Sequence, residues 1–192
     1  LPPSPLRRPQ GQRPRVHPAY DQALFDDKNY LCIPPLARLF DMRERVMEEV
    51  VESKPDLVAF SVLATTYRWA LEMAGRIKER TDVPIVFGGV HPSSVPERCI
   101  QEDAVDIVCV GEGEEALLEL CNSIERGEID HAIKNLWFKT PGGEIIKNPR
   151  RPQIQDLDAL PFPDKELFAP HVPIQNCYLS VVARGCPFAC SY

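Results

Sequence analysis

The sequence lacks any apolar run that approaches the roughly 18 residues needed to span a membrane. It also has no secretory apolar segment near its first residues. Positive charge is in deficit, because 22 Lys and Arg stand against 28 Asp and Glu and leave a formal net charge of −6. We therefore expect no membrane span, no secretion and no nucleic-acid partner.

The cysteines number seven, an odd count in a chain without secretory features. This pattern predicts a reducing compartment, the cytoplasm, where thiols stay free or bind metal instead of forming disulfides. The 192 residues suit one domain plus part of a second. Because the chain starts at Leu1 and stops at Tyr192, two residues after the second of two close cysteines, we expect a fragment.

Composition divides the chain into four parts. Residues 1–35 combine proline with arginine and predict an extended tail. Residues 36–148 predict an α/β domain, and the proline-rich residues 149–176 predict a semi-rigid linker. Residues 177–192 begin a second domain with a strand, which runs directly into a loop that contains two cysteines.

Hydrophobic periodicity predicts alternating helices and strands in the α/β domain. The expected helices cover residues 36–54, 67–80, 96–102 and 114–126, and the expected strands cover 56–62, 84–87 and 105–110. This order predicts a parallel sheet with right-handed crossovers and helices on both faces, with the strand at 56–62 buried on both sides. Two further segments, 136–140 and 144–147, predict an antiparallel hairpin at the sheet edge.

Ligands of an open parallel sheet bind beyond the carboxyl ends of its strands. The three predicted ends are residues 61–66, 88–94 and 111–114. Hydroxyl groups there include those of Ser61, Thr65 and Thr66, and the glycines are Gly88, Gly89, Gly111 and Gly113. Glycine lets backbone approach a ligand, so one interpretation is a cleft for a nucleotide-tailed cofactor. The other is that the glycines serve only tight turns, and spacing leaves both open because no G-x-G-x-x-G or Walker A motif is present.

Three polar side chains near these ends have alternative roles. His91 has no second metal ligand nearby in the sequence, so we favour a hydrogen bond to a ligand over metal binding or a role in its own turn. Glu112 and Glu114 have the chemistry of general bases. Acids beside a helix start more often stabilise its N-terminus, and we favour that role.

Six of the seven cysteines fall into two groups, and the seventh, Cys177, begins the predicted strand at 177–183. Four are expected to be small, buried or partly buried hydrophobic residues: Cys32, Cys99, Cys109 and Cys121. Cys186 and Cys190 instead share one loop directly after a predicted strand. Their C-x-x-x-C spacing fits neither zinc sites nor thioredoxin-like pairs, and spacing alone leaves a pair of free thiols open.

The chain resembles the cobalamin (B12)-binding radical S-adenosylmethionine (SAM) enzymes through five motifs in order. These are Lys54-Pro-Asp-Leu-Val-Ala-Phe-Ser61, Gly88-Gly-Val-His-Pro92, Val105-Asp-Ile-Val-Cys-Val-Gly-Glu-Gly-Glu114, Leu157-Asp-Ala-Leu-Pro-Phe-Pro-Asp164 and Arg184-Gly-Cys-Pro-Phe-Ala-Cys-Ser-Tyr192. The resemblance implies a Rossmann-like, flavodoxin-type cobalamin-binding domain, followed by the truncated start of a radical SAM β/α barrel.

The resemblance also implies the cofactors and their sites. Cys186 and Cys190 match two of the three thiolates of a C-x-x-x-C-x-x-C motif that holds a 4Fe–4S cluster, and the third cysteine would be residue 193. Tyr192 matches an aromatic residue on the SAM side. Without the third ligand, the fragment alone is expected to be inactive.

Cobalamin would bind at the strand ends of the first domain. The implied residues are Ser61, Thr65, Gly88, Gly89, His91, Gly111, Glu112 and Gly113. The D-x-H-x-x-G motif of many other B12 proteins is absent, so we expect no protein histidine on cobalt. Residues 1–35 also lack the additional strand and helix with which family members begin, which predicts an incomplete sheet.

The activity implied by the resemblance is methyl transfer to an unactivated carbon of a small molecule through a 5′-deoxyadenosyl radical. An electron donor such as flavodoxin or ferredoxin would reduce the cluster. Three alternatives stay open: a radical SAM oxidative cyclase or ring-modifying enzyme, a relative that does not bind cobalamin, and a flavodoxin-like module without activity.

Overall fold

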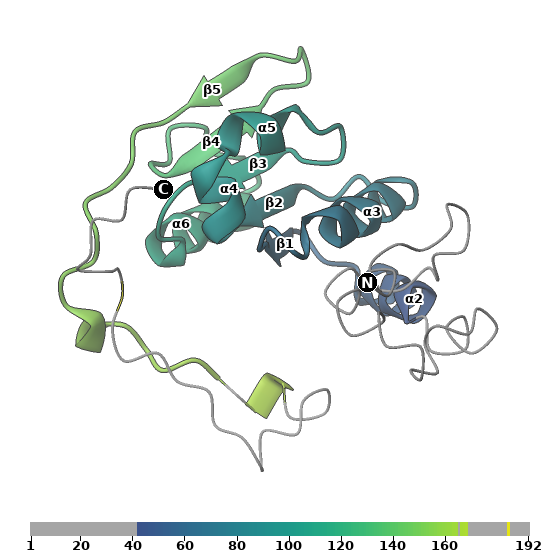
Figure 1. The fold of residues 1–192 in the computed structure, drawn as a ribbon, viewed down its shortest axis with the longest axis horizontal. Coiled ribbons are helices and arrows are strands. Elements are labelled where there is room, and N and C mark those ends of the chain that lie inside the picture. Colours follow the sequence, from purple (N-terminus) through teal and green to yellow (C-terminus); the bar gives the residue numbers. More distant parts are fainter. Residues whose placement is uncertain (1–41, 165, 169–183, 185–192) are drawn as a thin grey trace, which may run out of the picture. The chain divides into compact units, whose positions relative to one another are not determined.

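The computed structural model describes residues 42–164, 166–168 and 184. The chain divides into two compact units, Leu1–Gln153 and Ile154–Tyr192, and each is described by itself. The described part of the first unit contains a five-stranded sheet and its helices (Figure 1).

The elements of the first unit follow the predicted alternation closely. In chain order they are α2 (Arg43–Ser53), β1 (Val58–Ser61), α3 (Tyr67–Lys78), β2 (Ile85–Gly88), α4 (Val90–Ser94), α5 (Pro96–Gln101), β3 (Ile107–Cys109), α6 (Glu114–Glu125), β4 (Leu136–Lys139) and β5 (Ile145–Lys147). Helix α4 is an addition to the predicted elements. Residues 36–41, the expected first turns of the first helix, lie outside the described residues.

The strands form one sheet in the order β1-β2-β3-β4-β5. Strands β1, β2 and β3 are parallel, and β4 and β5 pair antiparallel on the far side of β3. The predicted parallel sheet with a hairpin at its edge is therefore confirmed. The parallel arrangement also brings the carboxyl ends of β1, β2 and β3 to the same end of the sheet.

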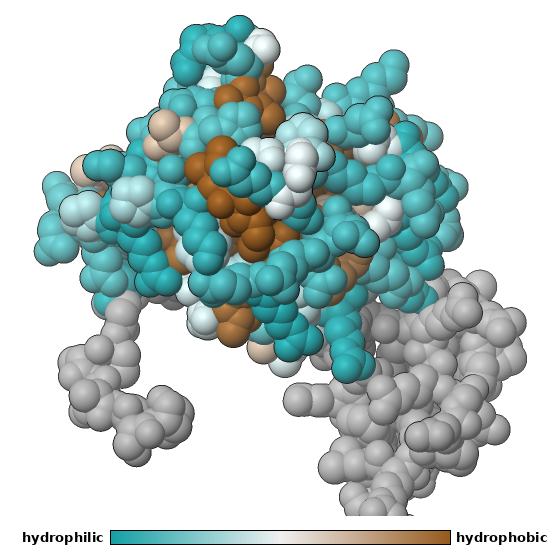
Figure 2. Space-filling view, turned by 90° about the horizontal axis from the view of Figure 1, so that it is seen from above, coloured by the Kyte–Doolittle hydropathy of each residue, from teal (hydrophilic) through white to brown (hydrophobic). Residues whose placement is uncertain are grey.

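The core lies on both faces of the sheet, because successive strand residues point to opposite sides. Phe87 belongs to a buried cluster with Met73 of α3 and Ile100 of α5. Its neighbour Val86 belongs to a second cluster, which includes Leu120 of α6. Helices therefore cover both faces, as predicted. Hydrophilic residues dominate the surface in Figure 2, where apolar residues gather near the centre of the view.

Strand β1 differs from its predicted environment. Residues 56–62 were expected to be buried on both faces, but Ala59 and Ser61 are exposed. Val58 and Phe60 point to the other face and are partly buried. The prediction is wrong because β1 is the end strand of the described sheet, so apolar composition alone did not reveal its exposed face.

Two helix ends show how the sequence sets the boundaries. Lys54 follows α2 with a left-handed φ of 47°, and the next residue is Pro55, which cannot continue a helix. Gly127 follows the C-cap of α6 with φ of 86°, and its N–H donates to the Ile124 carbonyl at 2.8 Å. The predicted stop at Gly127 is confirmed.

The described residues of the second unit contain two short 3₁₀ helices, η4 (Leu157–Ala159) and η5 (Glu166–Phe168). The Asp156 carboxylate accepts from the Asp158 N–H at 3.1 Å and so caps η4. The predicted strand at 177–183 and the start of a second domain lie outside the described residues, so the predicted domain division stays a prediction.

Candidate functional site

The loops after β1 and β2 are joined by backbone hydrogen bonds at the carboxyl end of the sheet. The Val62 N–H donates to the Gly88 carbonyl at 2.7 Å, one residue beyond the end of β1. The Val62 carbonyl then accepts from the His91 N–H at 3.2 Å. These contacts bring residues 61–66 and 88–94 together, as the sequence predicted.

Gly89 is required by the turn that starts α4. Its φ is 99°, a conformation that side chains disfavour, and an added Cβ would lie 3.0 Å from both the N and the O of Val62. Gly88 has more room, because its added Cβ would lie 3.5 Å from the Cys109 Cβ. Gly89, and not Gly88, is therefore the glycine whose missing side chain allows the loop after β2 to approach Val62 closely.

The loop after β3 is connected to the loop after β2. Gly111 has φ of 96°, and its N–H donates to the Ser93 hydroxyl oxygen at 2.9 Å. Gly113 is the N-cap of α6, and a Cβ there would lie 3.5 Å from the Cys109 sulfur. All three predicted strand-end loops therefore lie at one end of the sheet, and two of them need glycine for a left-handed φ.

The loops after β1 and β2 expose both polar and apolar side chains. Ser61 and Thr65 are exposed. The Thr66 hydroxyl instead accepts from the Leu63 N–H at 3.0 Å and donates to the Leu63 carbonyl at 3.2 Å. Leu63 is 53% exposed and Val90 is 69% exposed. This end of the sheet offers hydroxyl groups, backbone and apolar surface to a ligand.

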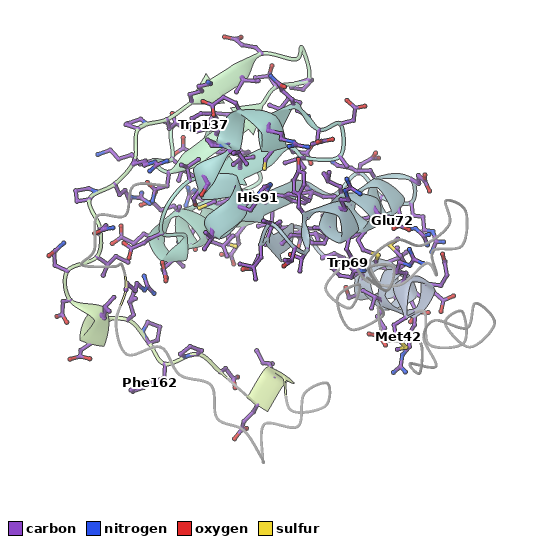
Figure 3. All side chains as sticks on the ribbon, in the orientation of Figure 1. Met42, Trp69, Glu72, His91, Trp137 and Phe162 are labelled. Carbon is purple, nitrogen blue, oxygen red and sulfur yellow. The ribbon has the colours of Figure 1, made fainter. Side chains whose placement is uncertain are left out.

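His91 lies in α4, where Figure 3 labels it, and the residue is partly buried. Its ring lies against the ring of Tyr67, with centroids 4.5 Å apart. The Nε2 atom is buried and has no hydrogen-bond partner among the described residues. Burial and a hydrogen bond to Glu102 raise the pKa of Tyr67, whose hydroxyl donates to that carboxylate at 2.9 Å. His91 thus helps to pack the loop that contains it.

The two acidic residues near β3 have different positions. Glu114 lies in the first turn of α6, where a carboxylate stabilises the N-terminus of a helix. Glu112 lies in the loop before it, and its carbonyl accepts from the Asn135 side chain at 2.7 Å. Sequence reasoning missed Asn135, which is 3% exposed and has φ of 70°. Only an asparagine near a predicted strand start could have suggested it, since asparagine tolerates a left-handed φ.

The cysteines divide by burial. Cys99 and Cys109 are buried as predicted, and burial raises the pKa of the Cys109 thiol to about 11. The prediction is wrong for Cys121, which is exposed on α6 because that helix turns Ala116, Leu120 and Ser123 inward. The expected cluster and SAM residues Cys186, Cys190 and Tyr192 lie outside the described residues, as does Cys32.

Among the described residues, no group of three or more His, Cys, Asp or Glu side chains could hold a metal ion. None of the helices in the same residues has the length and apolar character that a membrane span requires.

Comparison with known proteins adds family evidence to this geometry. Residues 31–121 match the model of the B12 binding domain. The cobalamin-dependent radical SAM methyltransferase TokK of Streptomyces tokunonensis is 26% identical over 97% of this chain and 27% of its own. Residues 31–121 therefore carry a B12 binding domain, and the chain is similar to cobalamin-dependent radical SAM enzymes.

Two further relatives are also similar. The anaerobic magnesium-protoporphyrin IX monomethyl ester cyclase of Rubrivivax gelatinosus is 28% identical over 78% of this chain and 28% of its own. An uncharacterized methyltransferase of Pyrococcus horikoshii is 31% identical over 72% of this chain and 31% of its own. The chain therefore spans less than a third of the length of these relatives.

Solved structures support the fold. The radical SAM methyltransferase TsrM from Kitasatospora setae, with cobalamin and a 4Fe–4S cluster bound, has a TM-score of 0.52 at 20% identity, over 80% of this chain and 29% of its own. The predicted Rossmann-like α/β sheet is therefore confirmed, and the B12 binding domain match covers the same part of the chain.

Proposed function

We propose that this chain contributes the cobalamin-binding domain of a cobalamin-dependent radical SAM enzyme, with the corrinoid held at the carboxyl ends of β1, β2 and β3. The observation that carries the proposal is the convergence of three loops there, two of which need glycine at Gly89 and Gly111. The match of residues 31–121 to the B12 binding domain supports the same assignment.

The residues at this end of the sheet fit such a ligand. Gly88, Gly89, Gly111 and Gly113 let the loops pack closely at this end of the sheet, because their missing side chains face Val62, Cys109 and Asn135. The exposed apolar side chains of Leu63 and Val90 offer surface to the corrin ring. The hydroxyls of Ser61 and Thr65 and the polar groups of Glu112 would be available for hydrogen bonds to the ligand.

His91 would contribute to this site by packing and not by binding cobalt. Its ring lies against Tyr67 and its Nε2 is buried, so the imidazole would have to leave that contact to reach a corrinoid. The absence of a D-x-H-x-x-G motif agrees with this. We therefore propose cobalamin without a protein histidine on cobalt.

The remaining cofactors are assigned to residues beyond the described part of the first unit. Cys186 and Cys190 would be two thiolate ligands of a 4Fe–4S cluster, with a third cysteine expected at residue 193, and Tyr192 would lie on the SAM side. When bound, these cofactors supply a 5′-deoxyadenosyl radical and a methyl group.

The proposed reaction is methyl transfer to an unactivated carbon of a small molecule, and the similarity to TokK supports it. The second candidate is oxidative cyclisation, because cyclases of Rubrivivax gelatinosus and Cereibacter sphaeroides are 28% and 30% identical to this chain. We further propose reduction by a flavodoxin or ferredoxin, a place in the cytoplasm and no nucleic-acid partner.

The test uses full-length protein purified without oxygen, reconstituted with iron, sulfide and hydroxocobalamin, and desalted. The proposal expects retained corrinoid absorbance and cluster iron, and release of both S-adenosylhomocysteine and 5′-deoxyadenosine from SAM under reducing conditions. Corrinoid with 5′-deoxyadenosine alone would favour the cyclase. Iron without corrinoid would favour a relative that does not bind cobalamin, and neither cofactor would favour the non-enzymatic module.

A further inference from the structure

The side chain of Asn135 joins the loop after β3 to the segment by which the chain leaves the sheet. Its Nδ2 donates to the Glu112 carbonyl at 2.7 Å, and its Oδ1 accepts from the Arg151 N–H at 2.6 Å. The residue is only 3% exposed. One buried amide therefore bridges two backbone segments that are far apart in the sequence.

The main chain of Asn135 makes the same connection. Its carbonyl accepts from the Val110 N–H at 2.8 Å, and its N–H donates to the Pro149 carbonyl at 3.0 Å. Residues 149–151 are called the exit segment. The two main-chain and two side-chain groups of Asn135 therefore all form hydrogen bonds, either to the residues that follow β3 or to the exit segment. The φ of 70° that this requires is one that asparagine tolerates and most residues do not.

Ser93 of α4 provides a second path between the same segments. Its hydroxyl oxygen accepts from the Gly111 N–H at 2.9 Å, and its carbonyl accepts from the Arg150 Nη2 at 3.1 Å. The loop after β3 is therefore fixed to the exit segment through both Asn135 and Ser93.

We propose that Asn135 is a positioning residue that holds Gly111, Glu112 and Gly113 in the conformation that receives the corrinoid, with the exit segment as its anchor. This inference rests on the proposed function and deepens it, because it assigns the shape of one binding loop to a residue outside that loop. The ligand would contact the loop, and Asn135 would act through the Glu112 carbonyl.

The chemistry of the amide makes the proposal testable. Asn135→Asp keeps the size of the side chain and an acceptor for the Arg151 N–H, but replaces the donor to Glu112 by a carboxylate oxygen. Two oxygens then face each other, and the loop should move away. Protonation of the introduced carboxyl restores a donor, so the defect should be reversed at mildly acidic pH.

The experiment measures the dissociation constant of hydroxocobalamin for full-length wild type, Asn135→Asp and the control Ile77→Val. Ile77 is fully buried in α3, so Ile77→Val reduces core packing away from the loops. All titrations are run well below the melting temperature of each variant. At neutral pH, Asn135→Asp should bind about tenfold more weakly or worse, and Ile77→Val should bind like wild type. The affinity of Asn135→Asp should return toward that of wild type as the pH falls.

Three results would overturn the inference. They are equal affinity of Asn135→Asp and wild type at neutral pH, an equal loss in Ile77→Val, and a loss in Asn135→Asp that does not depend on pH. If wild type itself binds no hydroxocobalamin, the proposed function is wrong and this inference falls with it. Wild-type binding therefore distinguishes the two failures.

Discussion

Gly89 approaches the backbone of Val62 so closely that a Cβ would lie 3.0 Å from both the nitrogen and the carbonyl oxygen of Val62. Because φ at Gly89 is also 99°, an alanine there is disfavoured by both space and conformation. Gly75 in α3 has no atom within 4 Å of its added Cβ and no left-handed φ. The two glycines therefore form a matched pair for substitution.

Gly89→Ala should lower the free energy of unfolding by about 1–3 kcal/mol and weaken hydroxocobalamin binding. Gly75→Ala should leave binding unchanged and raise stability by about 0.5–1 kcal/mol, because alanine is the better helix former. Urea denaturation and equilibrium titration measure the two effects. If both variants bound hydroxocobalamin with equal affinity, the turn at Gly89 would not be part of the proposed site.

Thiol reactivity should follow burial. At mildly alkaline pH, iodoacetamide should modify Cys121 in the folded protein and leave Cys99 and Cys109 largely unmodified. Burial protects both thiols and raises their pKa, to about 11 for Cys109. Peptide mass spectrometry measures the modified fraction of each, and denatured protein serves as the control. Rapid modification of Cys109 before unfolding would contradict its position beneath the glycine loops.

The ion pair between α2 and α3 should stabilise the fold. Arg43 is buried, and its Nη1 donates to both Glu72 carboxylate oxygens at 2.8 and 2.9 Å. Glu72→Ala should therefore cost about 1–3 kcal/mol of unfolding free energy. The exposed pair of Arg45 and Glu49 provides the control, and Glu49→Ala should cost less than about 0.5 kcal/mol. Similar losses of unfolding free energy in the two variants would show that burial of Arg43 does not strengthen its ion pair.

Tyr67 should make stability depend on alkaline pH. Burial, with the hydrogen bond to Glu102, raises its pKa in the folded state. The contribution of Tyr67 to folding stability is complete below the ordinary tyrosine pKa of about 10. It is lost as the pH rises from there toward the pKa of Tyr67 in the folded state. Wild type should thus be more stable than Tyr67→Phe near neutral pH, and the difference should shrink above about pH 10. Unfolding free energies across this range test it, and a constant difference would contradict it.

The sequence was sufficient for the order of helices and strands because the signal is local. Apolar segments such as 84–87 and 105–110 are short and lie between helical patterns, which predicts buried parallel strands. Cys121 was predicted wrongly because its residue type was weighed instead of its helical phase. Ala116, Leu120 and Ser123 follow the spacing of an inward face, and Cys121 lies off it.

The strand-end loops could be located from the sequence, but the residues that hold them could not. Asn135 lies 23 residues from Glu112 and 16 from Arg151, its two side-chain partners. No local pattern reports contacts at such separations, since they depend on how β4 returns alongside β3. The exposed face of β1 was missed for a related reason, because strand order is a property of the whole sheet.

Hydrogen–deuterium exchange with and without hydroxocobalamin tests the central claim most directly. In full-length protein, the corrinoid should slow exchange in residues 61–66, 88–94 and 111–114, at the carboxyl ends of the parallel strands. It should leave residues 140–144 unchanged, because this hairpin turn between β4 and β5 lies at the opposite end of the sheet. Unchanged exchange in all three loops at saturating hydroxocobalamin would contradict the account.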